Sequence, residues 1–234
     1  MPNNKAYFLS PDAYVCQTDD GLIVLDLKSN SYLGIGTEDA ASVIAALNGN
    51  YLPHSDSRIN TTINDLHALG ILTTRVNFGK PYAPCAITML RSPRHHSSTI
   101  PIPAISFRDV FHFAEAYATV MILLRLAKLR YLINKLQSAQ NSCRTTPDMA
   151  EFRHAMNRVA VFQRIRPWIY TARNECLFDS LVLSFFLRRS GCPSTLVIGV
   201  STNPFAAHAW VQFGSYVIDS NIEDILHFKP IVSA

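Results

Sequence analysis

The sequence of 234 residues predicts an α+β protein with two domains joined by a proline-rich linker. Three observations lead to this fold class. Strand-like segments and then short helical segments fill the first 80 residues. Prolines are dense in the stretch that follows, which excludes a regular helix there. Long helical patterns then lead into a second group of strands. We therefore expect domains at residues 1–80 and 106–234, with a linker at 81–105.

The composition fits a chain that buries a core and excludes several classes of protein. Hydrophobic residues make up 48% and charged residues 16%, which is not typical of a disordered chain. A formal net charge of +4 is too small to indicate nucleic-acid binding. The most apolar run, Ala118–Leu124, is too short to cross a bilayer. The sequence begins without the apolar segment of a signal peptide, so we expect a cytoplasmic protein.

The cysteines and histidines do not form a recognisable metal or disulfide pattern. The five cysteines are scattered and no pair has C-x-x-C spacing, which argues against a zinc ribbon and against a disulfide framework. The His95–His96 pair has no third ligand nearby, so solvated histidines of a polar linker are the better interpretation. We expect no metal and no cofactor.

The first domain has the element order of a small winged-helix-like module. Strands are expected at 13–17, 22–27 and 32–35, with an Asp20-Gly21 hairpin turn between the first two. Thr37 is a suitable N-cap for a helix that ends at Leu47, and a second helix covers about 57–69.

Two functions are open for such a module. DNA binding needs several cations on one face, and this segment has only Lys5, Lys28, Arg58 and Arg75. An exposed edge of a short sheet is better suited to the addition of a peptide strand. We therefore favour a peptide-recognition domain.

The linker is followed by two helical stretches. Apolar residues at spacings of three and four predict a helix from Phe107 to about Leu136, which packs into a core or against a partner. Its basic end, Arg125–Lys135, leaves contact with a membrane surface open. Thr146 and Pro147 are suited to begin the next helix, which ends near Arg166.

The sequence Asn174-Glu175-Cys176 places a thiol where another helix begins. The positive end of the helix dipole favours a thiolate, and the main-chain N–H groups there can receive an oxyanion. A buried structural cysteine is the alternative, because free cysteines are often buried. Gly191 ends the helix, and strand-like segments follow at 195–200, 206–213 and 216–219.

These strands carry a histidine and an aspartate that complete a catalytic pattern. His208 lies on the second strand, and a Gly214-Ser215 turn brings Asp219 beside it on the third. The expected roles are Cys176 as nucleophile, His208 as general base and acid, and Asp219 as the orienting acid. Glu223 and Asp224 lie close enough in sequence to remain alternatives for the acid.

The segments Cys176–Gly191, Leu196–Val200 and Pro204–Gln212 resemble the transglutaminase-like leader peptidase of lasso peptide biosynthesis. The resemblance covers about residues 150–234. It implies a papain-like cysteine protease domain and matches the family's cysteine, histidine and aspartate to Cys176, His208 and Asp219.

Residues 7–73 resemble, more weakly, the precursor-recognition element of that family, as in the fused form of the enzyme. The resemblance implies that a leader peptide pairs with the third strand and lies against the last helix. The peptide-binding residues would then be Tyr32, Leu33, Gly34, Ile35, Leu66 and Leu69.

The implied partners are a lasso precursor peptide and an asparagine-synthetase-like, ATP-dependent cyclase, which the helical stretch 107–137 would contact. Two other functions stay open: a transamidase of the same fold, and a precursor-binding adaptor without catalysis.

Overall fold

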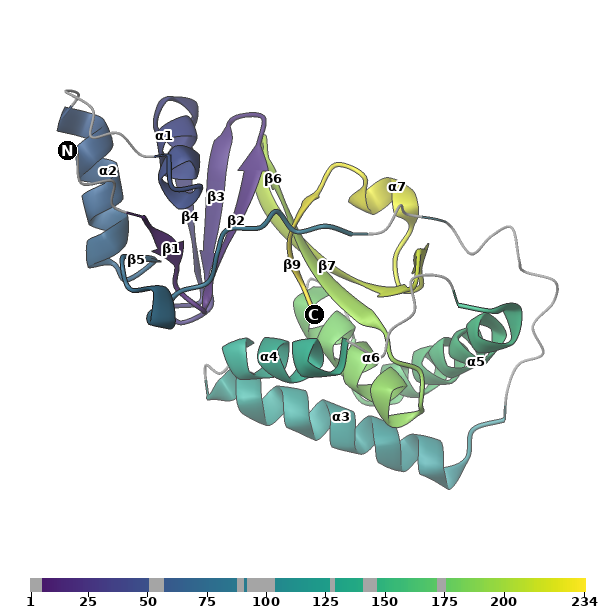
Figure 1. The fold of residues 1–234 in the computed structure, drawn as a ribbon. Helices are drawn as coiled ribbons and strands as arrows, with labels where there is room; N and C mark the ends of the chain where they lie inside the picture. Colours follow the sequence, from purple (N-terminus) through teal and green to yellow (C-terminus); the bar gives the residue numbers. More distant parts are fainter. Residues whose placement is uncertain are drawn as a thin grey trace. The chain divides into compact units, whose positions relative to one another are not determined.

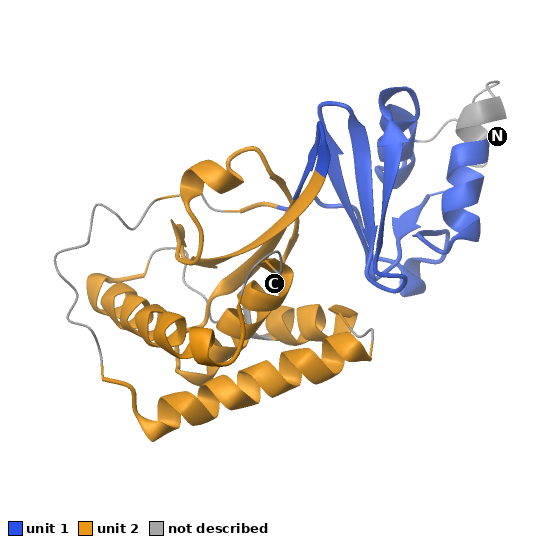
Figure 2. Ribbon diagram, turned by 180° about the vertical axis from the view of Figure 1, so that it is seen from behind, with its two compact units in different colours: residues 1–85, 200–205 blue, residues 86–199, 206–234 orange. Residues whose placement is uncertain are grey.

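The computed structural model describes residues 6–50, 57–87, 91, 104–126, 129–140, 147–171 and 176–234. They fall into two compact units (Figure 2). Unit 1 comprises Met1–Cys85 with Val200–Phe205, and unit 2 comprises Ala86–Gly199 with Ala206–Ala234. Each unit contains helices and strands, so the fold is mixed α and β. None of the helices in the described part of the chain is long and apolar enough to cross a membrane.

Unit 1 consists of a three-stranded sheet, a two-stranded sheet and helices, of which the first packs on the larger sheet and the second packs against the first helix and the smaller sheet (Figure 1). The larger sheet has the order β2-β3-β4 with antiparallel pairs, and the smaller sheet pairs β1 with β5. The elements are β1 (Phe8–Leu9), β2 (Ala13–Thr18), β3 (Gly21–Asp26), β4 (Ser31–Gly36), α1 (Thr37–Leu47), α2 (Ser57–Ala68), β5 (Leu72–Thr73) and η1 (Val76–Phe78).

Local sequence accounts for the turns of unit 1. Gly21 begins β3 with φ of 138°, and a Cβ at this position would overlap the Ile35 carbonyl oxygen. Only glycine tolerates this conformation and this close approach. Helix α1 begins one residue earlier than expected: Gly36 is the N-cap and Thr37 is the first helical residue. The prediction of Thr37 as a capping side chain was therefore wrong, because the extended Gly36 leads directly from β4 into the helix.

The hairpin segment Val200–Phe205 belongs to unit 1 although it comes late in the sequence. The Asn203 side-chain amide donates a hydrogen bond of 2.8 Å to Asp20, and Thr202 donates to the same carboxylate. The Phe205 ring lies 5.4 Å from the Tyr32 ring, centroid to centroid. The first unit is thus built from two separate parts of the sequence.

Unit 2 contains a four-stranded sheet with the order β8-β7-β6-β9 and a helical layer (Figure 1). Helix α6 is the centre of that layer and packs chiefly against α3, with further contacts to α5 and α4. The elements are α3 (Phe107–Arg125), α4 (Leu129–Gln140), α5 (Met149–Ile165), η3 (Arg166–Trp168), α6 (Cys176–Arg189), β6 (Thr195–Thr202), β7 (Phe205–Phe213), β8 (Tyr216–Val217), α7 (Ile222–Ile225) and β9 (Lys229–Ser233).

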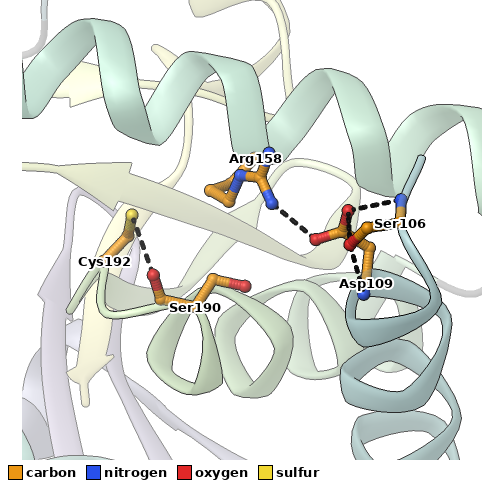
Figure 3. A network of polar contacts seen from close by, with 5 residues as sticks. All are labelled: Ser106, Asp109, Arg158, Ser190 and Cys192. Atoms are coloured by element: carbon orange, nitrogen blue, oxygen red, sulfur yellow. Dashed lines mark hydrogen bonds and ion pairs between the residues drawn. The ribbon is translucent and has the colours of Figure 1, made fainter. Parts of the chain in front are cut away.

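The start of α3 is held by a network of polar contacts (Figure 3). Ser106 and Asp109 form a capping box, and Arg158 of α5 donates a hydrogen bond of 2.5 Å to the Asp109 carboxylate. Asp109 is only 4% exposed, so its charge is neutralised where it is buried. The network ties α3 to α5.

Two sequence-based expectations for these helices need correction. The single helix expected from Phe107 to Leu136 is two helices, because α3 ends at Arg125 and α4 begins at Leu129. Asp148 caps α5, with Glu151 completing its capping box, whereas the expected cap Thr146 lies outside the described residues.

Part of the proline-rich linker is paired with unit 2. Arg91 forms a bridge with Tyr216 of β8, through hydrogen bonds to Ser215 and Val217. Ile87 packs against a core cluster that contains Trp210. The stretch from 81 to 105 therefore includes residues that belong to the second unit, and it is not a free spacer throughout.

Candidate active site

Cys176 is the first residue of α6, the most buried helix of unit 2. Every residue from Ser180 to Leu187 is buried, and this apolar run fixes the helix in the layer. Cys176 itself is half-buried. Asn174 and Glu175, which precede it, lie outside the described residues.

His208 of β7 shares a side-chain hydrogen bond with Cys176. The bond lowers the pKa of the Cys176 thiol, against the opposing effect of burial. It raises the pKa of the His208 imidazole, and the charges of Cys176, Asp219 and Asp224 act in the same direction. The two shifts favour a thiolate–imidazolium pair.

Main-chain groups add to this stabilisation of the sulfur. The N–H groups of Ala209 and Leu177 form hydrogen bonds that also lower the pKa of Cys176. Leu177 lies in the first turn of α6, where main-chain N–H groups have no partner within the helix. The same N–H groups can stabilise negative charge that develops on a bound carbonyl oxygen.

Asp219 follows β8 and lies deep in unit 2, although part of the residue remains accessible. Its Oδ1 accepts a hydrogen bond of 2.9 Å from the Val211 N–H, and its Oδ2 accepts one of 2.9 Å from the Ser180 hydroxyl. Burial raises the pKa of the carboxyl to about 6, while these hydrogen bonds lower it. Asp219 acts on His208 through its charge.

The other two candidate acids lie on α7. Asp224 also raises the pKa of His208 by its charge, but it is exposed and accepts a hydrogen bond of 3.2 Å from Asn221. Glu223 is exposed as well. Charges in water are screened, so an enclosed carboxylate is the stronger influence on the imidazole.

Aromatic rings flank His208, a feature that the sequence-based analysis did not identify. Phe228 stacks on the imidazole with a centroid distance of 5.4 Å, and Trp210 lies 6.4 Å away in a near-parallel orientation. Gly199 of β6 makes room for the Trp210 ring and for the Cβ of Phe228, because a Cβ on residue 199 would lie 2.7 Å from the first and 2.9 Å from the second. The alternation of His208 and Trp210 along one strand was the available signal.

A second unanticipated cluster surrounds Asp179, three residues after Cys176 on α6. Arg166 donates a hydrogen bond of 2.6 Å to this carboxylate, and the Tyr170 hydroxyl donates one of 2.7 Å. Tyr170 also stacks on Tyr117 and meets Phe178 edge to face. The cluster ties Arg166 and Tyr170 to the first turn of α6.

The remaining cysteines have different environments. Cys16 and Cys192 are buried, Cys85 is half-buried, and Cys143 lies outside the described residues. Burial raises the pKa of Cys192 to about 11, so this thiol stays protonated at neutral pH.

The residues expected to bind a peptide separate into two groups. Tyr32, Leu33 and Gly34 of β4 are exposed, and Leu69, just after α2, is 65% exposed. Ile35 and Leu66 are only 8% and 2% exposed and belong to the core of unit 1. The side chains of Ile35 and Leu66 are thus part of the core of unit 1, and peptide binding by these six residues stays a prediction.

Metal ligation finds no support in the described residues, where no group of three or more His, Cys, Asp or Glu side chains is placed to hold an ion. His95 and His96 lie outside the described residues.

Comparison with known proteins identifies one family. A model described as the transglutaminase-like superfamily matches residues 116–233, slightly more than half of the chain, from within α3 to the end of β9. The match spans Cys176, His208 and Asp219. No curated protein and no solved structure gave a significant match.

Proposed function

The chain belongs to the transglutaminase-like superfamily, whose fold serves cysteine proteases and transamidases, and we propose that it is a cysteine peptidase that removes the leader from a lasso peptide precursor. The observation that carries the proposal is the hydrogen bond between Cys176 and His208, with its opposite effects on the two pKa values. A thiolate paired with an imidazolium is the starting state of a cysteine protease.

The proposed reaction proceeds in two steps. The Cys176 sulfur attacks the carbonyl carbon of the last leader residue, and the oxyanion accepts hydrogen bonds from main-chain N–H groups at the start of α6. His208 gives its proton to the nitrogen of the core peptide, which leaves with a free amine. Water, deprotonated by His208, then hydrolyses the leader thioester and restores Cys176.

In this proposal unit 1 is a winged-helix-like recognition domain for the leader. Strand β4 lies at the end of the order β2-β3-β4, and all its residues except Ile35 are exposed. An extended peptide can add to such an edge through main-chain hydrogen bonds, with side-chain contacts from Tyr32, Leu33 and Leu69.

The product chemistry implies the second partner. A core with a free amine is a substrate for an ATP-dependent, asparagine-synthetase-like cyclase that joins the amine to a carboxyl side chain. We assign the contact to α3, whose exposed apolar residues include Phe107, Phe111 and Ile122, together with its C-cap Leu126. We expect Phe111→Glu to weaken co-purification with the cyclase; unchanged binding would exclude this part of α3.

The direct test is digestion of a leader-containing precursor, followed by mass spectrometry. We expect the wild-type chain to release a leader with a new carboxylate and a core with a new amine. Cys176→Ala should abolish both products, and Cys85→Ala, at another half-buried cysteine, should not. A leader joined to an added amine would indicate a transamidase, and binding without any product would indicate an adaptor.

A further inference from the structure

The Ser180 hydroxyl lies between the helix of the nucleophile and the buried acid. Ser180 follows Cys176 by one turn of α6, on the same face of the helix. It is 3% exposed, and its Oγ lies 2.9 Å from Asp219 Oδ2 and 3.1 Å from the Ala209 carbonyl oxygen. A hydroxyl carries one proton, so it donates to one of these acceptors at a time. The ionised carboxylate is the stronger acceptor.

Asp219 depends on few donors for its charge. Burial disfavours the ionised form and raises the pKa to about 6, and the hydrogen bonds from Val211 and Ser180 oppose this effect. Loss of one donor would raise the pKa further and so lower the fraction of ionised carboxyl at neutral pH. The hydrogen bond from Ser180 therefore opposes the effect of burial on Asp219.

The charged groups around Asp219 do not stabilise its ionised form in place of the Ser180 hydroxyl. Asp179 on α6 raises the pKa of Asp219 by its negative charge, and that charge is kept in place by Arg166 and Tyr170. Cys176 on α6, as a thiolate, is also negative. Asp224 on α7 is exposed and acts on His208. His208 is the group through which the charge of Asp219 affects the thiol.

We propose that Ser180 is a positioning residue that keeps Asp219 ionised at neutral pH and thereby extends the pH range in which Cys176 and His208 form a thiolate–imidazolium pair. The inference rests on the proposed roles of Cys176 and His208. Without the negative charge of Asp219 the His208 imidazolium is less stable. The proton then stays on the Cys176 sulfur in more of the molecules, and a smaller fraction of them contains the thiolate–imidazolium pair.

The test is the pH profile of Cys176 alkylation by iodoacetamide, followed by peptide mapping, because it needs no substrate. For the wild-type chain we expect a plateau around neutral pH. Ser180→Ala should lower the alkylation rate on this plateau by roughly threefold to tenfold. The increase in rate at higher pH, near the ordinary pKa of a thiol, should remain. Ser184→Ala is the matched control, since Ser184 is also buried on α6 and donates only to the Ser180 carbonyl oxygen, at 2.8 Å.

Two further variants separate positioning from packing. Ser180→Thr keeps the hydroxyl and should keep the plateau. In an Asp219→Asn background, Ser180→Ala should cause no additional loss, because both changes remove the same charge. A wild-type profile for a folded Ser180→Ala chain, a plateau lost in a folded Ser180→Thr chain, or an additive loss in the double variant would overturn the inference.

The outcome is distinguishable from that of the proposed function. A shifted profile without precursor cleavage would support the role of Ser180 and reject the peptidase. Cleavage together with an unshifted profile would reject the role of Ser180 alone.

Discussion

At the scale of single residues, two of the four cysteines that the structure describes have thiols of opposite character. Cys176 is half-buried beside an imidazole and N–H donors, which together lower its pKa. Cys192 lies 3.9 Å from the Ser190 carbonyl oxygen (Figure 3), and burial raises its pKa to about 11. The residue type is the same, so the difference comes from the surroundings alone.

We expect this contrast to appear as selective labelling. At pH 7 a thiol of pKa about 11 is about 10⁻⁴ ionised, so iodoacetamide should modify Cys176 at least ~10-fold faster than Cys192. His208→Ala should slow the labelling of Cys176, and His112→Ala, on α3, should not. Equal labelling rates in the His208→Ala and wild-type chains, measured by peptide mapping, would show that the imidazole does not activate this thiol.

We expect removal of the Asp219 charge to make the folded chain more stable at high pH and less active. Burial raises its pKa from 3.8 to about 6 in the folded state, so its stabilising contribution is complete below pH 3.8 and is lost as the pH rises through about 6. Asp219→Asn should therefore raise the free energy of unfolding at pH 8 by on the order of 1–2 kcal/mol, with little difference at pH 4. Precursor cleavage should fall by more than about tenfold. Urea unfolding that shows the variant to be less stable at pH 8 would contradict this sign.

The residues of the site differ in how far the sequence predicts them. The position of Cys176 at a helix start and the turn between His208 and Asp219 follow from local signals, namely an apolar helical run and a glycine at positive φ. The hydrogen bond from Ser180 to Asp219 does not follow from local signals, because the two residues are 39 positions apart in sequence. Its place one turn after Cys176 was a signal, but only the fold shows which acceptor it meets.

At the scale of elements, β6 and β7 determine where the imidazole lies. Gly199 of β6 leaves space for Trp210 and Phe228, which flank His208. The sequence identified these strands, but glycine in a buried strand indicates a close approach without naming the approaching group. The break between α3 and α4 was missed for a related reason: apolar periodicity continues through it.

We expect Gly199→Ala to displace one of the two rings. The added Cβ would lie 2.7 Å from the buried Trp210 ring and 2.9 Å from the Cβ of Phe228, which packs against the same core cluster. Overpacking of this kind costs about 1–3 kcal/mol, which thermal unfolding would measure. The alkylation rate of Cys176 should fall as well, because His208 loses its stacking partner. Unchanged stability and unchanged alkylation would mean that the rings do not hold the imidazole.

At the scale of the whole molecule, we propose that unit 1 recognises the leader and that unit 2 carries the catalytic residues. The sequence predicts an α+β chain with two domains, and the family match covers the second. The sequence does not reveal that Val200–Phe205 belongs to the first unit, because this membership depends on contacts between segments that are distant in sequence.

If unit 1 recognises the leader and unit 2 carries the catalytic residues, a substitution on β4 should weaken leader binding and leave the reactivity of Cys176 unchanged. Leu33→Glu, at a residue 38% exposed, should weaken binding of a synthetic leader by roughly tenfold. The alkylation rate of Cys176 should stay unchanged. Val76→Glu, at another exposed apolar residue of unit 1, is the matched control and should bind normally. If Leu33→Glu binds the leader as the wild-type chain does, β4 is not the recognition edge.

The central claim is that Cys176 forms a covalent bond to the leader. The most direct measurement is the mass of the intact chain after brief mixing with the precursor and quenching in acid, followed by peptide mapping. The account predicts a thioester adduct of the leader at Cys176 that disappears as free leader forms. Leader release without any adduct at Cys176, and with full activity retained in Cys176→Ala, would contradict it.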